Sequence, residues 1–129
     1  MAKPILDYKV SLDWGAKATE TLTGYTGVSI DFSVATPTVS YPAATGDLVD
    51  GVVLVDASEN EQVRVVVEGI VPVKITTAGT IVKGDLLMVN TAGGFIEATT
   101  GEIAIARALN APAANGDIIL ARLINPTTA

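Results

Sequence analysis

The sequence predicts a single, mainly all-β domain, and three of its features carry that prediction. Valine, isoleucine and threonine are abundant along the whole chain, and β-branched residues fit the pleated, half-buried surface of a sheet better than a helix. Apolar and polar residues alternate with a period of two in several segments, as they do along a strand with one buried face. Glycine-containing turn signals separate these strand-length segments. A chain of 129 residues fits one domain.

The first 25 residues are expected to form an N-terminal arm or edge element. Four large apolar residues alternate there with Lys9, Ser11 and Asp13, which predicts a strand with one large apolar face. These apolar residues are Tyr8, Val10, Leu12 and Trp14. Two interpretations of this face stay open. It packs on the protein's own core, or the arm adds to a sheet edge or an apolar groove of a partner, where backbone hydrogen bonds provide affinity.

Residues 26–129 are expected to form the compact body. Strands are predicted over two alternating segments and three continuous apolar runs: 28–34 and 63–68, then 51–55, 86–89 and 118–124. Residues 102–110 are compatible with a helix or a strand. The strand is preferred because Ile103, Ile105, Arg107 and Leu109 also fall on one strand face.

One local pattern occurs three times in the body. Gly46-Asp47, Gly84-Asp85 and Gly116-Asp117 are each followed by two aliphatic residues that enter a predicted strand. Unequal intervals between the three copies argue against a solenoid or a propeller, in which the period is fixed. We expect them to be equivalent corners of a small barrel or sandwich. The alternative is that Gly-Asp is simply a common turn dipeptide.

The composition excludes several classes of function. The chain has no cysteine and no histidine, which excludes disulfides, thiolate metal sites, and Ser-His-Asp or Cys-His catalysis. Eight basic residues stand against 14 acidic ones, for a net charge of −6. This balance argues against nucleic acid as a partner, because affinity for a phosphate backbone comes mainly from lysine and arginine.

Hydropathy gives a second set of expectations. No apolar stretch has the length of a membrane span or a signal-peptide core, so we expect no membrane partner and synthesis in a cytoplasm. The mean hydropathy is nevertheless +0.46. Because solitary monomers rarely expose large apolar patches, we expect another subunit or partner to cover part of this surface.

The excess acidic charge lies in residues 46–73, around the turn 56–61. Its candidate functional carboxylates are Asp47, Asp50, Asp56, Glu59 and Glu61. Two carboxylates can hydrolyse a glycoside, but these lie in turns without aromatic residues nearby for a sugar platform. A calcium loop needs a glycine and a distal glutamate at fixed positions, and this segment lacks that spacing. A solvated, charged turn is the favoured interpretation, with no metal.

Two further motifs suggest ligands only weakly. The glycine pair in Thr91–Phe95 lacks the Lys-Ser/Thr and the strand-to-helix context of a phosphate-binding loop, so it predicts a hairpin. Residues 79–87 resemble the turn-and-strand pattern of lipoyl and biotinyl carrier domains, with Lys74 or Lys83 as the modifiable lysine. Neither lysine has the flanking residues typical of those carriers. A carrier module of a larger enzyme is the alternative function.

The order of motifs from residue 46 onward provides a more specific signal. The motifs are Gly46-Asp47-Leu48-Val49, Gly51-Val52-Val53, Val55-Asp56-Ala57, Val65-Val66-Val67-Glu68-Gly69-Ile70-Val71, Ala78-Gly79, Gly84-Asp85, Gly93-Gly94-Phe95 and Gly116-Asp117-Ile118. In spacing and texture this order resembles the small capsid cement, or head-decoration, proteins of tailed bacteriophages.

The resemblance implies a non-enzymatic protein whose body is a β-barrel or β-tadpole, commonly trimeric and bound outside an icosahedral shell. Residues 1–25 would be the arm and residues 26–129 the decoration domain. An N-terminal arm in such proteins typically pairs with the major capsid protein. By analogy the capsid-binding residues here are Ile5, Leu6, Tyr8, Val10, Leu12 and Trp14.

The expected function is therefore to bind the outer surface of the expanded head and to stabilise contacts between capsid subunits, without a cofactor. The protein would be located on the outer surface of the virion, after synthesis in the host cytoplasm. Another structural virion component, such as a tail or fibre module, is a further alternative.

Overall fold

The computed structural model describes residues 9–10, 16–33 and 35–129, and within these ranges the regular structure consists of eleven strands. They are β1 (Lys9–Val10), β2 (Ala16–Ala18), β3 (Thr26–Asp31), β4 (Thr38–Ser40), β5 (Gly51–Val53), β6 (Gln62–Val63), β7 (Val65–Lys74), β8 (Leu86–Val89), β9 (Phe95–Glu97), β10 (Ile103–Ala108) and β11 (Ile118–Thr128). The described ranges contain no helix that could span a membrane. The predicted all-β class is confirmed.

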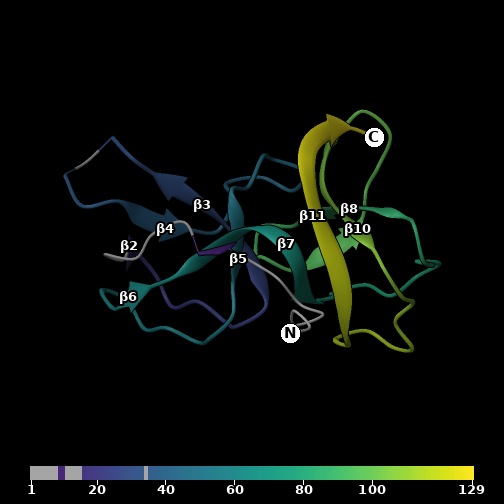
Figure 1. Ribbon diagram of the computed structural model, residues 1–129, viewed down its shortest axis with the longest axis horizontal. Helices are drawn as coiled ribbons and strands as arrows, with labels where there is room; N and C mark the ends of the chain where they lie inside the picture. The colour runs from purple at the N-terminus through teal and green to yellow at the C-terminus, as the bar shows by residue number, and fades with distance from the viewer. Residues whose placement is uncertain (1–8, 11–15, 34) are drawn as a thin grey trace, which may run out of the picture.

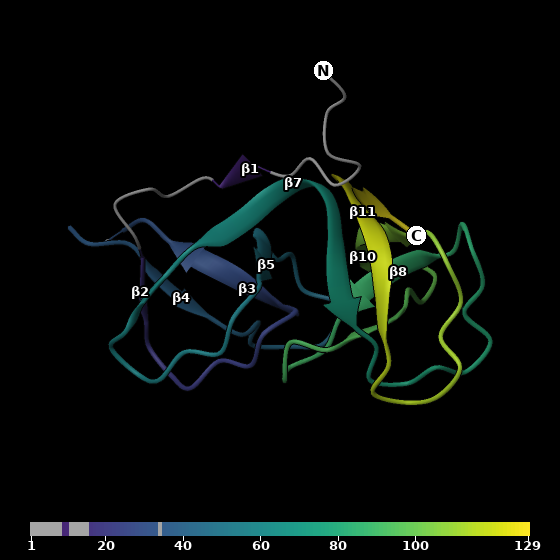
Figure 2. The same cartoon turned by 60° about the horizontal axis from the view of Figure 1, so that its bottom comes forward.

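The strands form one continuous but open sheet. Its order is β6-β2-β4-β3-β5-β7-β11-β10-β8-β9, with β1 paired to β7 beside this path. In the part of the chain that the structure describes, β6 and β9 end the path without pairing to each other, so the sheet is not the closed barrel that the corners suggested. Figures 1 and 2 show two groups of strands, with β7 running from one to the other. We call β2, β3, β4 and β6 the first strand group, and β8 to β11 the second.

Each strand group has its own hydrophobic core. The smaller core consists of Ala16, Ala18, Leu22, Val28, Val39, Val53, Ala57, Val63 and Val65. The larger core consists of Val49, Val52, Val66, Val71, Val73, Ile75, Ile81, Leu87, Val89, Phe95, Ile105, Ala106, Ala108, Ile119 and Ala121. Strands β5 and β7 contribute alternate residues to both cores, because successive side chains of a strand point to opposite faces. Because both faces of these two strands are buried where they pair with each other, their sequences there are continuous valine runs rather than alternating apolar and polar residues.

Strand β7 changes partner along its length. Val65 and Val66 pair with β5, whereas Gly69 to Lys74 pair with β11. Gly69, at the change, has a φ of 106°, which glycine adopts far more readily than residues with a Cβ. The bend lets one strand serve both cores.

Within the segment expected as the arm or edge element, residues 16–25 pack against the body. Strand β2 pairs with β4 in parallel and with β6 antiparallel. Ala16 and Ala18 are fully buried while Lys17 between them is exposed, and Leu22 is buried in the smaller core. The sequence pattern missed this strand because its inward residues are alanines, whose small side chains give a weak periodic signal.

Most strands of the body follow the sequence expectations. Residues 102–110 contain β10, a strand rather than a helix, and residues 86–89 form β8 with the predicted bounds. The run at 118–124 begins β11, which continues to Thr128. Phe32 is an exception: it was expected on the inward face of a strand, but β3 ends at Asp31 and Phe32 is exposed.

The three Gly-Asp pairs are equivalent corners, as predicted. The glycines Gly46, Gly84 and Gly116 have φ values of 86°, 97° and 89°, as the third residue of a type II turn requires. At each corner the aspartate N–H donates to the carbonyl three residues earlier, and the aspartate carboxylate accepts the N–H of that same residue. The residues concerned are Ala44, Val82 and Ala114.

A fourth corner of the same kind was not predicted. Asn60 has a φ of 73° in the glycine position, and Glu61 takes the place of the aspartate. The Glu61 N–H donates to the Ser58 carbonyl, and the Glu61 carboxylate accepts the Ser58 N–H. Asparagine adopts a positive φ more readily than most residues, so Glu59-Asn60-Glu61 contained a turn signal within the acidic segment.

The corner carboxylates are expected to stabilise the fold. Asp117 accepts the N–H groups of Ala113 and Ala114 at 2.8 and 3.0 Å, so Asp117→Ala should lower the free energy of unfolding by about 1–2 kcal/mol. Asp117→Asn keeps an acceptor oxygen and should cost less than half as much. Urea denaturation of both variants measures the difference. Equal losses for alanine and asparagine would contradict the role of the carboxylate as an acceptor.

Candidate interaction site

The predicted arm meets the body at β7. Strand β1 pairs antiparallel with β7, with Lys9 opposite Glu68 and Val10 opposite Val66, and Figure 2 shows it lying along β7. Val10 is the single predicted arm residue within the described ranges. Ile5, Leu6, Tyr8, Leu12 and Trp14 lie outside the described residues. At Lys9 and Val10, therefore, the arm adds a strand to its own chain.

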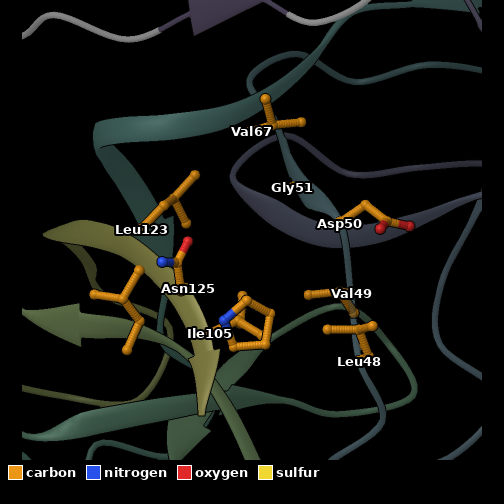
Figure 3. Close-up of a pocket in the computed structure, with 10 residues that line it drawn as sticks. Leu48, Val49, Asp50, Gly51, Val67, Ile105, Leu123 and Asn125 are labelled. Carbon is orange, nitrogen blue, oxygen red and sulfur yellow. The ribbon is translucent and has the colours of Figure 1, made fainter.

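A groove with a volume of about 200 Å³ lies beside the middle of β7, between the segment that enters β5 and the C-terminal half of β11. Figure 3 shows residues that line it. They come from the segment entering β5, from β7, from β10 and from the C-terminal half of β11: Leu48, Val49, Asp50, Gly51, Val67, Ile105, Leu123, Ile124, Asn125 and Pro126. Sequence reasoning did not bring these segments together, because they are distant along the chain.

The groove brings no pair of reactive groups together. Asp50 is its one titratable residue, and its Oδ2 accepts the Ile30 N–H at 2.7 Å. Figure 3 shows this carboxylate directed away from Leu123 and Asn125. A Cβ at Gly51 would overlap the Val66 carbonyl oxygen, so glycine allows β5 and β7 to approach closely here.

Four of the five acidic residues singled out from the sequence, all except Glu59, accept hydrogen bonds from backbone N–H groups of described residues. Asp56 Oδ1 accepts the Gly24 N–H at 2.7 Å, and Asp47 and Glu61 close two of the corners. Within the described ranges, no group of three or more acidic residues is arranged to hold a metal ion. The carboxylates of this segment thus hold loops and corners in place through hydrogen bonds to backbone N–H groups.

The glycine pair at 93–94 and the two candidate carrier lysines lie in turns and strands of the sheet. The Asn90 N–H donates to the Gly94 carbonyl and the Gly93 N–H to the Asn90 carbonyl, which closes the predicted hairpin between β8 and β9. Lys74 is the last residue of β7 and is half-buried opposite Ile118, so it does not lie at a hairpin tip. Lys83 is exposed beside Gly84 in one of the corners.

The loop between β3 and β4 presents an exposed aromatic residue. Figure 1 shows this hairpin extending away from β7. Phe32, just after β3, is 62% exposed. Asp31 Oδ1 accepts both the Ser33 Oγ–H at 2.6 Å and the Ser33 N–H at 2.8 Å. The loop is therefore held by a local turn that leaves the Phe32 ring in solvent.

These hydrogen bonds lower the pKa of Asp31 below its ordinary value, through the Ser33 hydroxyl first and the Ser33 N–H second. Because folding depresses this pKa, the associated stabilisation is present above the ordinary aspartate pKa and is lost as the pH falls through the lowered one. We expect Ser33→Ala to raise the pKa of Asp31 towards the ordinary value, as measured by NMR titration of its carboxyl carbon. An unchanged pKa in this variant would contradict the role of the hydroxyl.

Comparison with known proteins shows what kind of protein carries these surfaces. A model of the phage cement protein family matches residues 7–123. The chain belongs to the phage cement protein family. The fold of this cement protein is also similar to that of a solved structure, the head fiber gp8.5 N base of bacteriophage phi29, with a TM-score of 0.66 and 14% sequence identity. That comparison covers 93% of this chain and 95% of the phi29 chain. No curated protein matches the sequence.

The family match covers more of this cement protein than the resemblance did. It starts at residue 7, whereas the motifs that suggested the family began at Gly46. Four predicted arm residues, Tyr8, Val10, Leu12 and Trp14, lie within the matched range. As a phage cement protein, the chain is a structural component of the virion at the capsid, and this assignment favours a virion role over the carrier module.

Proposed function

We propose that this cement protein binds the outer surface of the expanded phage head and stabilises contacts between neighbouring major capsid protein subunits, without catalysing a reaction. The observation that carries the proposal is the family match over residues 7–123. The arm residues Ile5, Leu6, Tyr8, Val10, Leu12 and Trp14 form the main contact with the capsid, and three copies act together as a homotrimer.

The pairing of β1 with β7 shows that Lys9 and Val10 take the extended backbone that strand addition requires. Backbone groups of Lys9 and Val10 take part in a sheet ladder, which is the geometry by which an extended segment adds to a sheet edge of a partner. The apolar residues of this segment alternate with polar ones, so one face can enter a groove while the other stays in water. The same segment thus satisfies the two requirements of strand addition.

The stabilising effect follows from mass action. A protein that binds the expanded shell and not its precursor shifts the equilibrium towards the expanded state, by an amount that grows with its concentration relative to Kd. Three linked arms convert modest single contacts into slow release, because the second and third contacts form at a high effective concentration. A protein that stabilises the shell in this way needs only its capsid-binding surfaces and a rigid body, and no active site.

Binding to purified heads tests the proposal. Expanded heads without their decoration protein are mixed with increasing amounts of the cement protein and sedimented, and the bound fraction is measured. We expect saturable binding to expanded heads, much weaker binding to unexpanded precursor shells, and a higher temperature of head disruption at saturation. Absence of saturable binding to expanded heads would refute the proposal.

A further inference from the structure

The outer face of β7, β11, β10 and β8 carries an unusual row of residues. In the register of the sheet, Ile70 lies opposite Arg122, Arg122 opposite Arg107, and Arg107 opposite Leu86. The neighbouring residues Val71, Ala121, Ala106 and Leu87 are buried in the larger core, so this row faces away from the core. We call this surface the arginine face.

Arg107 and Arg122 lie directly opposite each other on the antiparallel strands β10 and β11. Like charges directly opposite each other on antiparallel strands destabilise a sheet. Arg107 Nη1 donates to the Gly84 carbonyl at 2.6 Å. Arg122 makes no side-chain hydrogen bond or ion pair with any described residue. The register therefore places two like charges opposite each other, and of the two only Arg107 has a hydrogen-bond partner among the described residues.

Apolar side chains extend the arginine face. Ile118 and Leu120 point to the same side of β11 as Arg122 and are 50% and 38% exposed, and Lys74 lies opposite Ile118. Three of the eight basic residues of an acidic chain are thus gathered on one partly apolar surface. Exposed apolar area next to unpaired arginine is typical of protein–protein interfaces.

A surface of complementary chemistry lies at the loop between β2 and β3 and the loop between β5 and β6. A recess of about 290 Å³ is lined by Thr21, Leu22, Thr23, Asp56, Ala57, Ser58 and Glu61. Only Oδ1 of Asp56 and Oε1 of Glu61 accept hydrogen bonds from described residues, which leaves the second oxygen of each carboxylate available. A water occupies about 30 Å³ in the liquid, so the recess has room for a guanidinium group. We call it the acidic recess.

We propose that the arginine face of one copy docks on the acidic recess of a second copy, with the Arg122 guanidinium between Asp56 and Glu61. The occupant is a second copy because this chain itself supplies the matching charges. The two surfaces differ, so the contact is head-to-tail. Copies joined in this way form a closed ring when the rotation from each copy to the next adds up to a full turn. The inference rests on the homotrimer of the proposed function and names its interface.

Charge reversal tests the contact through the mass of the assembly. We expect the full chain to form closed oligomers in sedimentation velocity and native mass spectrometry at low ionic strength, and Arg122→Glu to weaken the association constant by roughly 30-fold or more. Lys83→Glu makes the same charge change at an exposed residue outside the arginine face. It should leave the number of copies in the oligomer unchanged. Glu61→Gln keeps an acceptor for the Ser58 N–H and should weaken association less than Arg122→Glu.

Combining reversed charges distinguishes this contact from a general charge effect. Arg122→Glu together with Glu61→Arg in one chain should restore closed oligomers. Mixing the two single variants should restore association between unlike variants only, because both unlike orientations pair opposite charges while contacts between like variants stay repulsive. A ring of three cannot alternate two variants, so the mixture should differ in mass from the closed oligomers of the double variant. A monomeric wild-type protein at low ionic strength, an unchanged mass for Arg122→Glu, or failure of the double variant to reassociate despite native circular dichroism would overturn the inference.

The same samples separate this inference from the proposed function. Self-association is measured without heads, and binding to expanded heads is measured by sedimentation. Oligomers that depend on Arg122 but do not bind heads would support the interface and refute the capsid role. Head binding by a wild-type protein that is monomeric in solution would support the capsid role and overturn the interface.

Discussion

Deletion of residues 1–14 is expected to weaken binding to expanded heads by at least about 100-fold, which corresponds to about 2.8 kcal/mol, while the body remains folded. The deleted segment contains the apolar residues of the proposed capsid contact, and burial of one such side chain contributes about 1.5–3 kcal/mol. Every described residue of the two cores lies at Ala16 or later, so we expect the cores to be retained. Head binding by sedimentation and a cooperative urea denaturation of the truncated protein are the two measurements.

A matched pair of full-length variants shows which side of the arm acts. Replacing Tyr8, Val10, Leu12 and Trp14 by serine should reproduce the loss of binding. Replacing Lys9, Ser11 and Asp13 by asparagine changes the polar residues that alternate with the apolar ones in the sequence and should retain most of the affinity. Unchanged binding by the truncated protein would show that the arm is not the capsid contact.

The substitution Phe95→Ala is expected to cause the largest loss of stability, about 3–5 kcal/mol. Phe95 is fully buried in the larger core. It pairs with Val89 across the hairpin and forms an isolated bridge with Ile75, so its removal leaves a cavity where β8, β9 and the end of β7 meet. The midpoint of urea denaturation at constant slope measures the change in the free energy of unfolding.

The chain supplies its own control, because Phe32 is its other phenylalanine. Phe32 is 62% exposed, and Phe32→Ala should change the free energy of unfolding by no more than about 0.5 kcal/mol. Both variants are compared at the same protein concentration, because association with other copies stabilises the folded state. Similar losses for the two substitutions would contradict the placement of Phe95 in the core.

Several elements of the fold were predictable because their signals are local. The corners at Gly46, Gly84 and Gly116 need a positive φ and a nearby acceptor, and both requirements are met by adjacent residues. Strand β8 is bounded by a corner and a hairpin, so its bounds were predicted correctly. Strand β2 was missed because its burial depends on β4 and β6, which approach it from distant parts of the chain.

The interaction surfaces show the same division. Alternation in residues 8–14 predicts an apolar strand face without reference to any other segment. The groove beside β7, the arginine face and the acidic recess each combine residues from segments far apart in sequence. Arg107 and Arg122 are unremarkable in the sequence, and only the register of β10 against β11 places them opposite each other.

By itself the sequence determined that this protein is built of strands, where most of them turn, and which catalytic chemistries its residue types exclude, because backbone preference, side-chain periodicity and composition are properties of short segments. Only the tertiary structure decided that the sheet stays open, that β7 serves two cores, and which charges face one another. Those features depend on strand pairing between distant segments, and pairing is selected by the packing of the whole chain.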